Sequence, residues 1–161
     1  MTGIPFSSKS RNIFEKALQA AELKREEIFA TSCLKCSIEA TKIIQERHFR
    51  ICSDHLFRQL ELIKPKVVCT MGPRTMKILL GNYKHKIPER NEDEEDYHGK
   101  PIMIKPRRTV FNKKKIFLPS FKFYLVPTYN PAIVDNYSIE KKIISDVITA
   151  KKLLDIKELL F

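Results

Sequence analysis

The chain has 161 residues, which is enough for one domain with a substantial core and short for two. Hydrophobic residues make up 43% of it, and 30 Lys and Arg against 19 Asp and Glu give a net charge of +11. That charge favours a polyanionic partner such as nucleic acid or an acidic surface, although a lysine-rich composition alone would produce the same balance.

No signal peptide opens the chain, and no apolar run approaches the roughly 18 residues of a membrane-spanning helix. We therefore expect a soluble, intracellular protein, in the cytoplasm or nucleoid, with no membrane partner. In such a reducing environment the four cysteines are expected to be metal ligands or core residues rather than disulfides.

The first predicted elements are a helix over residues 8–24, with apolar residues on one face, and a strand over residues 27–35. Apolar residues then recur at spacings of three and four from Phe49 to Ile63, which predicts a second helix. This helix should end at Lys64, because a residue that precedes proline is pushed out of the α region.

Residues 66–71 are apolar and β-branched on both faces, as in a buried parallel strand. Gly72 supplies a sharp turn, and Pro73 begins a helix that Gly81 ends. A further buried strand is predicted at 123–126, then a rigid polar loop at 127–131 and a last helix at 138–157. Residues 1–161 are thus expected to form a single α/β domain, with about three parallel strands and with functional sites at the carboxyl ends of those strands.

Residues 82–121 are irregular. Five consecutive acids at 92–96 indicate a solvated loop, and 102–104 with 116–118 could form the arms of a hairpin. Its tip surrounds Phe111 with basic residues, which suits phosphate contacts and base stacking, although a merely soluble tip would have the same composition. The candidate DNA-binding residues in this tip are Arg107, Arg108, Lys113, Lys114 and Lys115.

The cysteines have metal-ligand spacing. Cys33, Cys36, Cys52 and His55 form a CxxC and a CxxH, which satisfies the arithmetic of a zinc site. Simple buried thiols are the alternative, since free cysteine is among the most buried residue types.

At the strand ends, Ser32, Gly72 and residues 128–130 should converge if the sheet is parallel. The Asn130 amide could read a base edge or orient a water molecule. The sequence shows no Ser-His-Asp pattern and no strong general base near these ends, which counts against a self-sufficient hydrolase, and no catalytic residue is assigned. With only four glycines, the chain has no Rossmann fingerprint.

Several motifs nevertheless occur in a familiar order. These are Gly3-Ile4-Pro5-Phe6, Thr31-Ser32-Cys33-Leu34-Lys35-Cys36, Cys52 with residues 59–67, Met71-Gly72 and Pro127-Thr128-Tyr129-Asn130-Pro131-Ala132. In this the chain resembles the family 4 uracil-DNA glycosylases, the iron–sulfur members of the uracil-DNA glycosylase superfamily. The resemblance covers nearly the whole chain, except that residues 82–122 match poorly and read as a divergent insertion.

The resemblance implies a three-layer α/β/α sandwich with a four-stranded parallel sheet. It also implies a DNA-repair hydrolase for base excision, which cleaves the bond between uracil and deoxyribose after the nucleotide is flipped out. Phe6 would stack on uracil, and Ser32 and Asn130 would line the base pocket, at positions where the family has asparagine and histidine. Cys36 and Cys52 would hold a [4Fe-4S] cluster, and Tyr129 would contact DNA together with the basic tip.

The resemblance also predicts what is missing. The family begins with a CxxC pair, a strand and a GEAPG-like loop, and this chain starts after them. Three interpretations follow: a separate polypeptide supplies these parts, a diverged relative keeps only DNA or partner binding, or the sequence is truncated. Because Ser32 and Asn130 replace donors of the base pocket, activity is expected to be weak, altered or absent. The alternative is a catalytically inactive scaffold that binds DNA or a protein partner.

Overall fold

The computed structural model describes residues 5–6, 9–35, 45–82, 97–106, 119–134 and 136–156. The predictions for Cys36, for the acidic residues 92–96 and for the basic tip at 107–115 lie outside these described residues. The elements are α1 (Lys9–Ala20), η1 (Arg25–Glu27), α2 (Glu46–Ile63), β1 (Val67–Met71), α3 (Pro73–Asn82), β2 (Ile102–Ile104), β3 (Phe123–Thr128), η3 (Pro131–Ile133) and α4 (Tyr137–Leu154).

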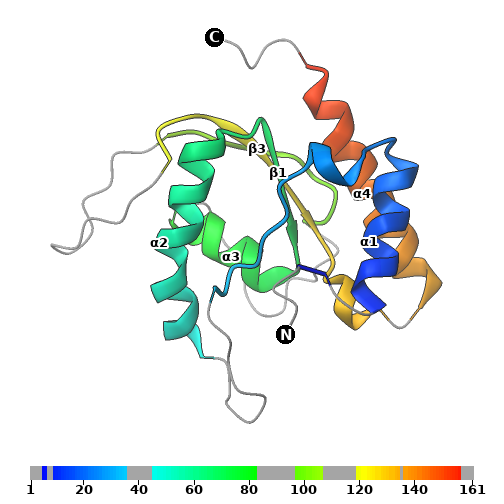
Figure 1. Cartoon of the computed structure of the whole chain (residues 1–161), viewed down its shortest axis with the longest axis horizontal. Coiled ribbons are helices and arrows are strands. Elements are labelled where there is room, and N and C mark those ends of the chain that lie inside the picture. The colour runs from blue at the N-terminus through cyan, green and yellow to red at the C-terminus, as the bar shows by residue number, and fades with distance from the viewer. Residues whose placement is uncertain are drawn as a thin grey trace, which may run out of the picture.

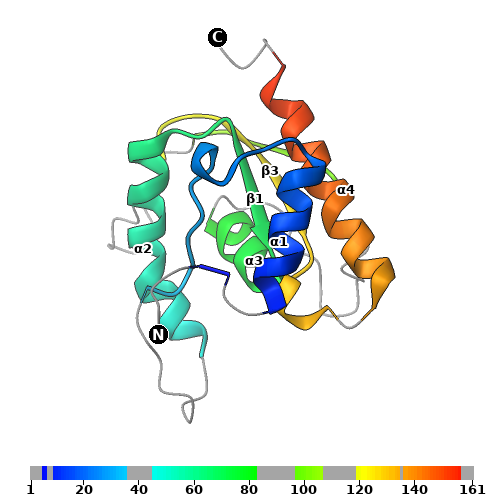
Figure 2. The ribbon, with the colours of Figure 1, turned by 45° about the vertical axis from the view of Figure 1, so that its right-hand side comes forward.

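Helices cover both faces of a small sheet, with α2 and α3 on one side and α1 and α4 on the other (Figures 1 and 2). Each side has its own apolar cluster. Phe57, Leu79 and Phe123 belong to the cluster under α2 and α3, and Phe14 and Ile143 belong to the cluster under α1 and α4. The three-layer α/β/α architecture predicted from the sequence is confirmed, as are the four helices, within a few residues at each end.

The sheet has the order β1-β3-β2. β3 is the central strand, and Phe123, Leu125 and Val126 on it are fully buried. It pairs in parallel with β1, with Val67 opposite Tyr124. β2 is antiparallel to β3, so the described sheet is mixed rather than wholly parallel. Pro127 has no backbone N–H to donate to a neighbouring strand. It is tolerated in β3 because the pairing with β2 ends at Leu125, so no hydrogen bond of the sheet is lost.

Two strand predictions need correction. Residues 27–35 contain the end of η1 followed by an irregular segment, because among the described residues no neighbouring strand lies beside them. Residues 102–104 do form a strand, but its partner is β3, whereas the predicted partner at 116–118 lies outside the described residues. None of the described helices has the length and apolar character needed to span a membrane.

Candidate active site at the carboxyl edge of the sheet

The carboxyl ends of β1 and β3 meet at Gly72. Its N–H donates a hydrogen bond to the Thr128 carbonyl oxygen over 2.8 Å. Gly72 has a φ of +104°, and a Cβ at this position would lie only 3.1 Å from the Asn130 Cβ. Glycine is therefore required here on both counts. The predicted convergence of Gly72 with residues 128–130 is confirmed.

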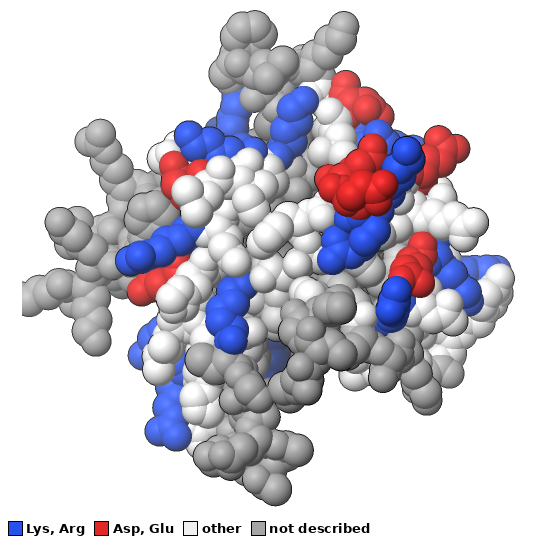
Figure 3. All heavy atoms as spheres, viewed as in Figure 1, with Lys and Arg blue, Asp and Glu red and all other residues white. Residues whose placement is uncertain are grey.

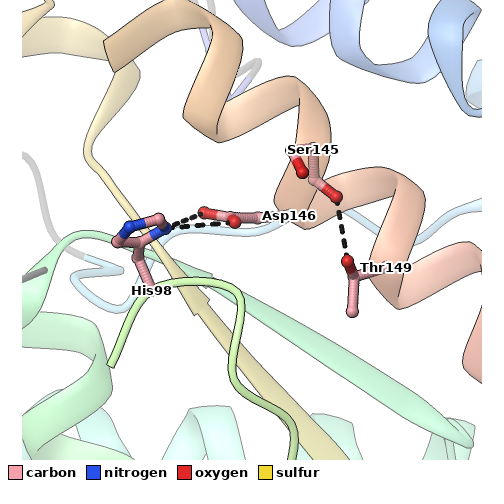
Figure 4. Close-up of polar contacts among 4 residues, drawn as sticks. All are labelled: His98, Ser145, Asp146 and Thr149. Atoms are coloured by element: carbon pink, nitrogen blue, oxygen red, sulfur yellow. Dashed lines mark hydrogen bonds and ion pairs between the residues drawn. The ribbon is translucent and has the colours of Figure 1, made fainter. Parts of the chain in front are cut away.

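A turn at residues 97–99 brings a histidine to the same edge. The Gly99 N–H donates to the Pro127 carbonyl oxygen over 2.8 Å, which fixes the turn against the end of β3. His98 Nδ1 then lies 3.2 and 3.3 Å from the two carboxylate oxygens of Asp146 on α4 (Figure 4). Its ring also packs at 5.0 Å against the ring of Tyr129.

Asp146 is an unusual residue for the inner face of a helix. It is only 3% exposed, and burial raises the pKa of its carboxyl group, although His98 and Lys142 act in the opposite direction. Gly99 lies directly against it, with a φ of +68°, and a Cβ at that position would collide with a carboxylate oxygen. One turn further along α4, the Thr149 hydroxyl bonds back to the Ser145 carbonyl oxygen and takes no part in this contact (Figure 4).

A small cavity opens beside this pair, and His98, Gly72, Thr128 and Tyr129 are among the residues that line it. Its volume of about 20 Å³ accommodates roughly one water molecule and is far too small for a pyrimidine ring. An imidazole held by a buried carboxylate beside such a cavity is a typical arrangement for a group that orients or deprotonates water. No general base near the strand ends was visible in the sequence pattern, and His98 is a candidate there that the pattern did not identify.

The residues predicted for the base pocket lie around this edge in different settings. Phe6 has a φ of 60° and stacks on Phe14 of α1, with ring centroids 4.3 Å apart. The Asn130 Oδ1 accepts the Ala132 N–H over 3.0 Å and so caps η3. Tyr129 is 8% exposed, so its ring is core rather than a free surface for DNA. Ser32 is exposed and lines neither this small cavity nor the larger groove beside β1.

Cys33 and Cys52 lie on the other side of the sheet, in the layer of α2 and α3. Cys52 on α2 is 3% exposed, and its Sγ accepts the Lys35 N–H over 3.5 Å. Burial raises the pKa of the Cys33 thiol, and nearby Cys52 adds a smaller effect in the same direction. His55 is exposed on α2.

This arrangement fits one ligand of a metal group but does not complete a site. A buried sulfur that receives a backbone N–H is typical of cysteines that hold iron–sulfur clusters, whose potentials such bonds tune. Within the described part of the chain, no three His, Cys, Asp or Glu side chains lie close enough together to hold a metal ion. Cys36 lies outside that part, so the cluster pair is not tested. The three described members of the zinc set, Cys33, Cys52 and His55, do not form such a group by themselves.

The comparison with known proteins identifies the fold. A family model described as "Uracil DNA glycosylase superfamily" matches residues 1–147. The chain belongs to this superfamily.

Relatives at low identity agree with that assignment. A type-4 uracil-DNA glycosylase of Sulfurisphaera tokodaii is 25% identical over 131 residues, which are 81% of this chain and 52% of the relative. The enzyme of the same name from Saccharolobus solfataricus is 26% identical over 157 residues, 96% of this chain and 65% of the relative. A third, from Archaeoglobus fulgidus, is 31% identical over 72 residues, 45% of this chain and 36% of the relative. The chain thus spans between about a third and two thirds of the length of these superfamily members.

Sequence reasoning placed the candidate site at the carboxyl edge of the sheet, and it missed the His98–Asp146 pair that the structure brings there. His98 lies just after residues 83–96, where the sequence shows no clear pattern, and Asp146 sits in a helix whose other buried residues are apolar. The one available signal was a carboxylate on the apolar face of the last helix, where an unpaired charge would be expensive to bury.

Proposed function

We propose that the chain is a uracil-DNA glycosylase of the base excision repair type, which binds DNA and hydrolyses the bond between uracil and deoxyribose when a partner polypeptide completes it. The superfamily match carries this proposal. The His98–Asp146 pair, beside Gly72 and Asn130 at the carboxyl edge, supplies chemistry suited to it.

In this proposal the bond between uracil N1 and deoxyribose C1′ breaks, and a water oxygen bonds to C1′. His98 orients that water and takes its proton, while Asp146 holds the ring through Nδ1. The departing uracil anion is protonated at a nitrogen. Proton transfer of this kind typically contributes about 10²- to 10⁴-fold to a rate.

The base itself needs more room than the closed edge offers. The cavity of about 20 Å³ cannot hold uracil, so the edge has to open when a flipped nucleotide enters. Phe6 has one ring face on Phe14, so we assign its other face to the base. Asn130 reads the base through its amide nitrogen, because its oxygen is engaged by Ala132.

The proposed cofactor is a [4Fe-4S] cluster, bound by Cys36 and Cys52 and completed by two cysteines of the partner. Four cysteines are the usual complement of such a cluster, which supports a shared site. The buried Cys52 Sγ and its bond from Lys35 support its part in this proposal. The alternative is a zinc ion held by Cys33, Cys36, Cys52 and His55.

DNA binding is assigned to the basic surface. The net charge of +11 and the residues of the proposed tip, Arg107, Arg108, Lys113, Lys114 and Lys115, favour phosphate contacts. The same proposal implies a partner polypeptide. It also implies that the protein acts inside the cell where DNA is present, in the cytoplasm or nucleoid.

A second candidate function is that of an inactive scaffold that binds DNA or a protein. Two observations favour it: Ser32 is exposed and does not line the small cavity beside His98, and the Asn130 oxygen is occupied by a local bond. In this arrangement the Ser32 hydroxyl and the Asn130 amide oxygen do not serve base recognition.

Uracil excision separates the two functions. Anaerobically purified protein, with any copurifying polypeptide retained, is incubated with single- and double-stranded oligonucleotides that carry one uracil, and abasic sites are revealed by alkaline cleavage. The glycosylase proposal expects cleavage at uracil and none in the matched thymine oligonucleotide. DNA binding without cleavage would instead identify the scaffold.

A further inference from the structure

β1 lies at an open edge of the sheet. The Tyr124 N–H donates to the Lys66 carbonyl oxygen over 2.9 Å, and the Gly72 N–H donates to Thr128, so the even-numbered residues of this stretch direct their backbone groups towards β3. Because these groups alternate along a strand, the N–H and C=O of Val67, Cys69 and Met71 point away from β3. Among the described residues, β1 pairs with β3 alone.

This edge opens into a groove of about 410 Å³ that runs along the whole of β1. The opposite wall is the irregular segment from Ile28 to Cys33, which follows β1 at a distance in both ribbon views (Figures 1 and 2). We call this space the β1 groove. In the space-filling view an uncharged area lies between α2 and α1, with Lys and Arg side chains around it (Figure 3).

Both sides of the β1 groove are apolar. Leu56, Leu60 and Leu79 line it from the layer of α2 and α3, and Val147 and Leu154 line it from the layer of α4. Cys69 lies at its floor, where solvent reaches part of the residue but burial of the sulfur raises the pKa of the thiol to about 12.

Such a groove suits an occupant with backbone donors and acceptors. A buried N–H or C=O that is left unpaired costs about 1–3 kcal/mol, and the edge of β1 presents these groups within an apolar space. A helix has no free backbone groups along its side, so it cannot satisfy them. A second copy is poorly suited, because its own β1 edge is recessed between the same two helical layers.

We propose that the β1 groove binds an extended segment of a partner polypeptide, which adds to the sheet as a strand beside β1 and places apolar side chains on both faces. This deepens the partner proposal above but does not depend on glycosylase activity. The curated relatives are longer than the region matched to this chain, so additional polypeptide accompanies the fold in those proteins. Residues 27–35, predicted to be a strand, would then have a strand beside them.

The test measures hydrogen exchange of individual amides in the presence of synthetic peptides. Two short probe peptides have a core of alternating Val and Ile flanked by Lys. Each has a matched control peptide with a proline at its centre. In the free chain, the amides of Val67, Cys69 and Met71 are expected to exchange faster than those of Val68 and Thr70, which bond to β3. Binding of the all-Val/Ile peptides should slow the first set at least about tenfold and leave the second set unchanged. The proline peptides should bind more weakly, because they lack a ladder donor.

Val67→Pro provides a matched variant. The Val67 N–H faces the groove and Val67 is the first residue of β1, so proline there leaves the β3 ladder intact. It should abolish peptide binding, whereas Val67→Ala, which keeps the N–H, should retain it.

Three results would overturn the proposal: equal protection of all β1 amides in the free chain, no binding of either Val/Ile peptide, or protection that rises with protein concentration alone and so identifies a second copy. The measurements contain no DNA, so failure of uracil excision would leave this proposal standing, and failure of peptide binding would leave the glycosylase proposal standing.

Discussion

Gly72 and Gly99 are the residues that allow the candidate active site to close. Gly72 turns the chain from β1 into α3 while its backbone approaches Asn130, and Gly99 lets the 97–99 turn lie against Asp146. Both have positive φ, a conformation that L side chains rarely adopt. The site therefore depends on backbone positions as much as on the side chains that carry chemistry.

Gly72→Ala should lower the free energy of unfolding by about 1–3 kcal/mol, because alanine is strained at this φ and its Cβ would crowd Asn130. Urea unfolding measures the change. Gly81→Ala is the control, since Gly81 lies within α3 and alanine there should stabilise the protein by about 0.5–1 kcal/mol. Equal effects of the two substitutions would contradict the geometry described for Gly72.

Asp146 should make stability depend on pH. Burial raises its pKa in the folded state above the unfolded value, so the folded protein binds more protons between these two values. The contribution of Asp146 to stability is therefore present below the unfolded pKa and is lost as pH rises through the folded pKa.

Asp146→Asn should remove that dependence, since an amide can still accept a hydrogen bond from His98 but carries no charge. Urea unfolding of both proteins over a series of pH values measures the difference between them, which cancels the other carboxylates. The difference is expected to shift in favour of the variant as pH rises through the folded-state pKa of Asp146. A difference that stays constant with pH would show that the pKa of Asp146 is not raised.

At the scale of elements, the sequence pattern predicted those helices and strands that depend mainly on local sequence. The helices α1 to α4 and the strands β1 and β3 follow from apolar spacing and from the punctuation at Lys64–Pro65 and Gly72–Pro73. Residues 27–35 have strand composition but form no strand among the described residues, because a strand also needs a neighbour, and the β1 groove separates them from β1. The antiparallel pairing of β2 with β3 could not be predicted either, because it depends on a tertiary contact between distant residues.

The same limit applied to the site. The meeting of Gly72 with residues 128–130 could be predicted, because parallel strands end at one edge. The His98–Asp146 contact joins residues 48 positions apart through a turn with no strong sequence signal, so no spacing rule points to it. Phe6 and Tyr129 were predicted as contacts for the base and for DNA, but the packing of Phe6 on Phe14 and of Tyr129 on His98 depends on tertiary contacts that the sequence does not display.

The metal proposal is tested on α2. Cys52→Ser should sharply reduce bound iron in protein purified with its partner in the absence of air, because it removes a cluster ligand. His55→Ala should leave iron unchanged, since histidine belongs only to the zinc alternative. Metal analysis of both variants decides the matter. If the protein binds zinc and no iron, and if His55→Ala loses that zinc, the cluster proposal is wrong and the zinc site is correct.

On the face that Figure 3 shows, charged side chains of both signs surround an uncharged area, and the positive net charge belongs to the whole sequence. A net charge of +11 on 161 residues should give DNA binding that depends strongly on salt. The two helical layers, the open sheet edge between them and this charge support the proposal that the domain binds DNA through phosphates and that a partner polypeptide completes it.

Fluorescence anisotropy with a uracil-free duplex at several salt concentrations should show the logarithm of affinity falling linearly with the logarithm of salt. Replacing Arg107 and Arg108 by Ala should make the slope shallower by about 0.9 for each phosphate that these side chains would otherwise neutralise. Lys152→Ala, an exposed cation at the end of α4, is the comparison variant. An equal change of slope in both proteins would assign binding to overall charge rather than to the proposed tip.

The central claim is that the His98–Asp146 pair at the carboxyl edge acts in uracil excision. Single-turnover excision from a uracil-containing single strand, by anaerobically purified protein with its copurifying polypeptide, tests it most directly. His98→Ala should lower the rate about 100-fold or more, and Gln19→Ala, an exposed change on α1, should leave it unaltered. Excision by His98→Ala at the rate of the unsubstituted protein would contradict the account.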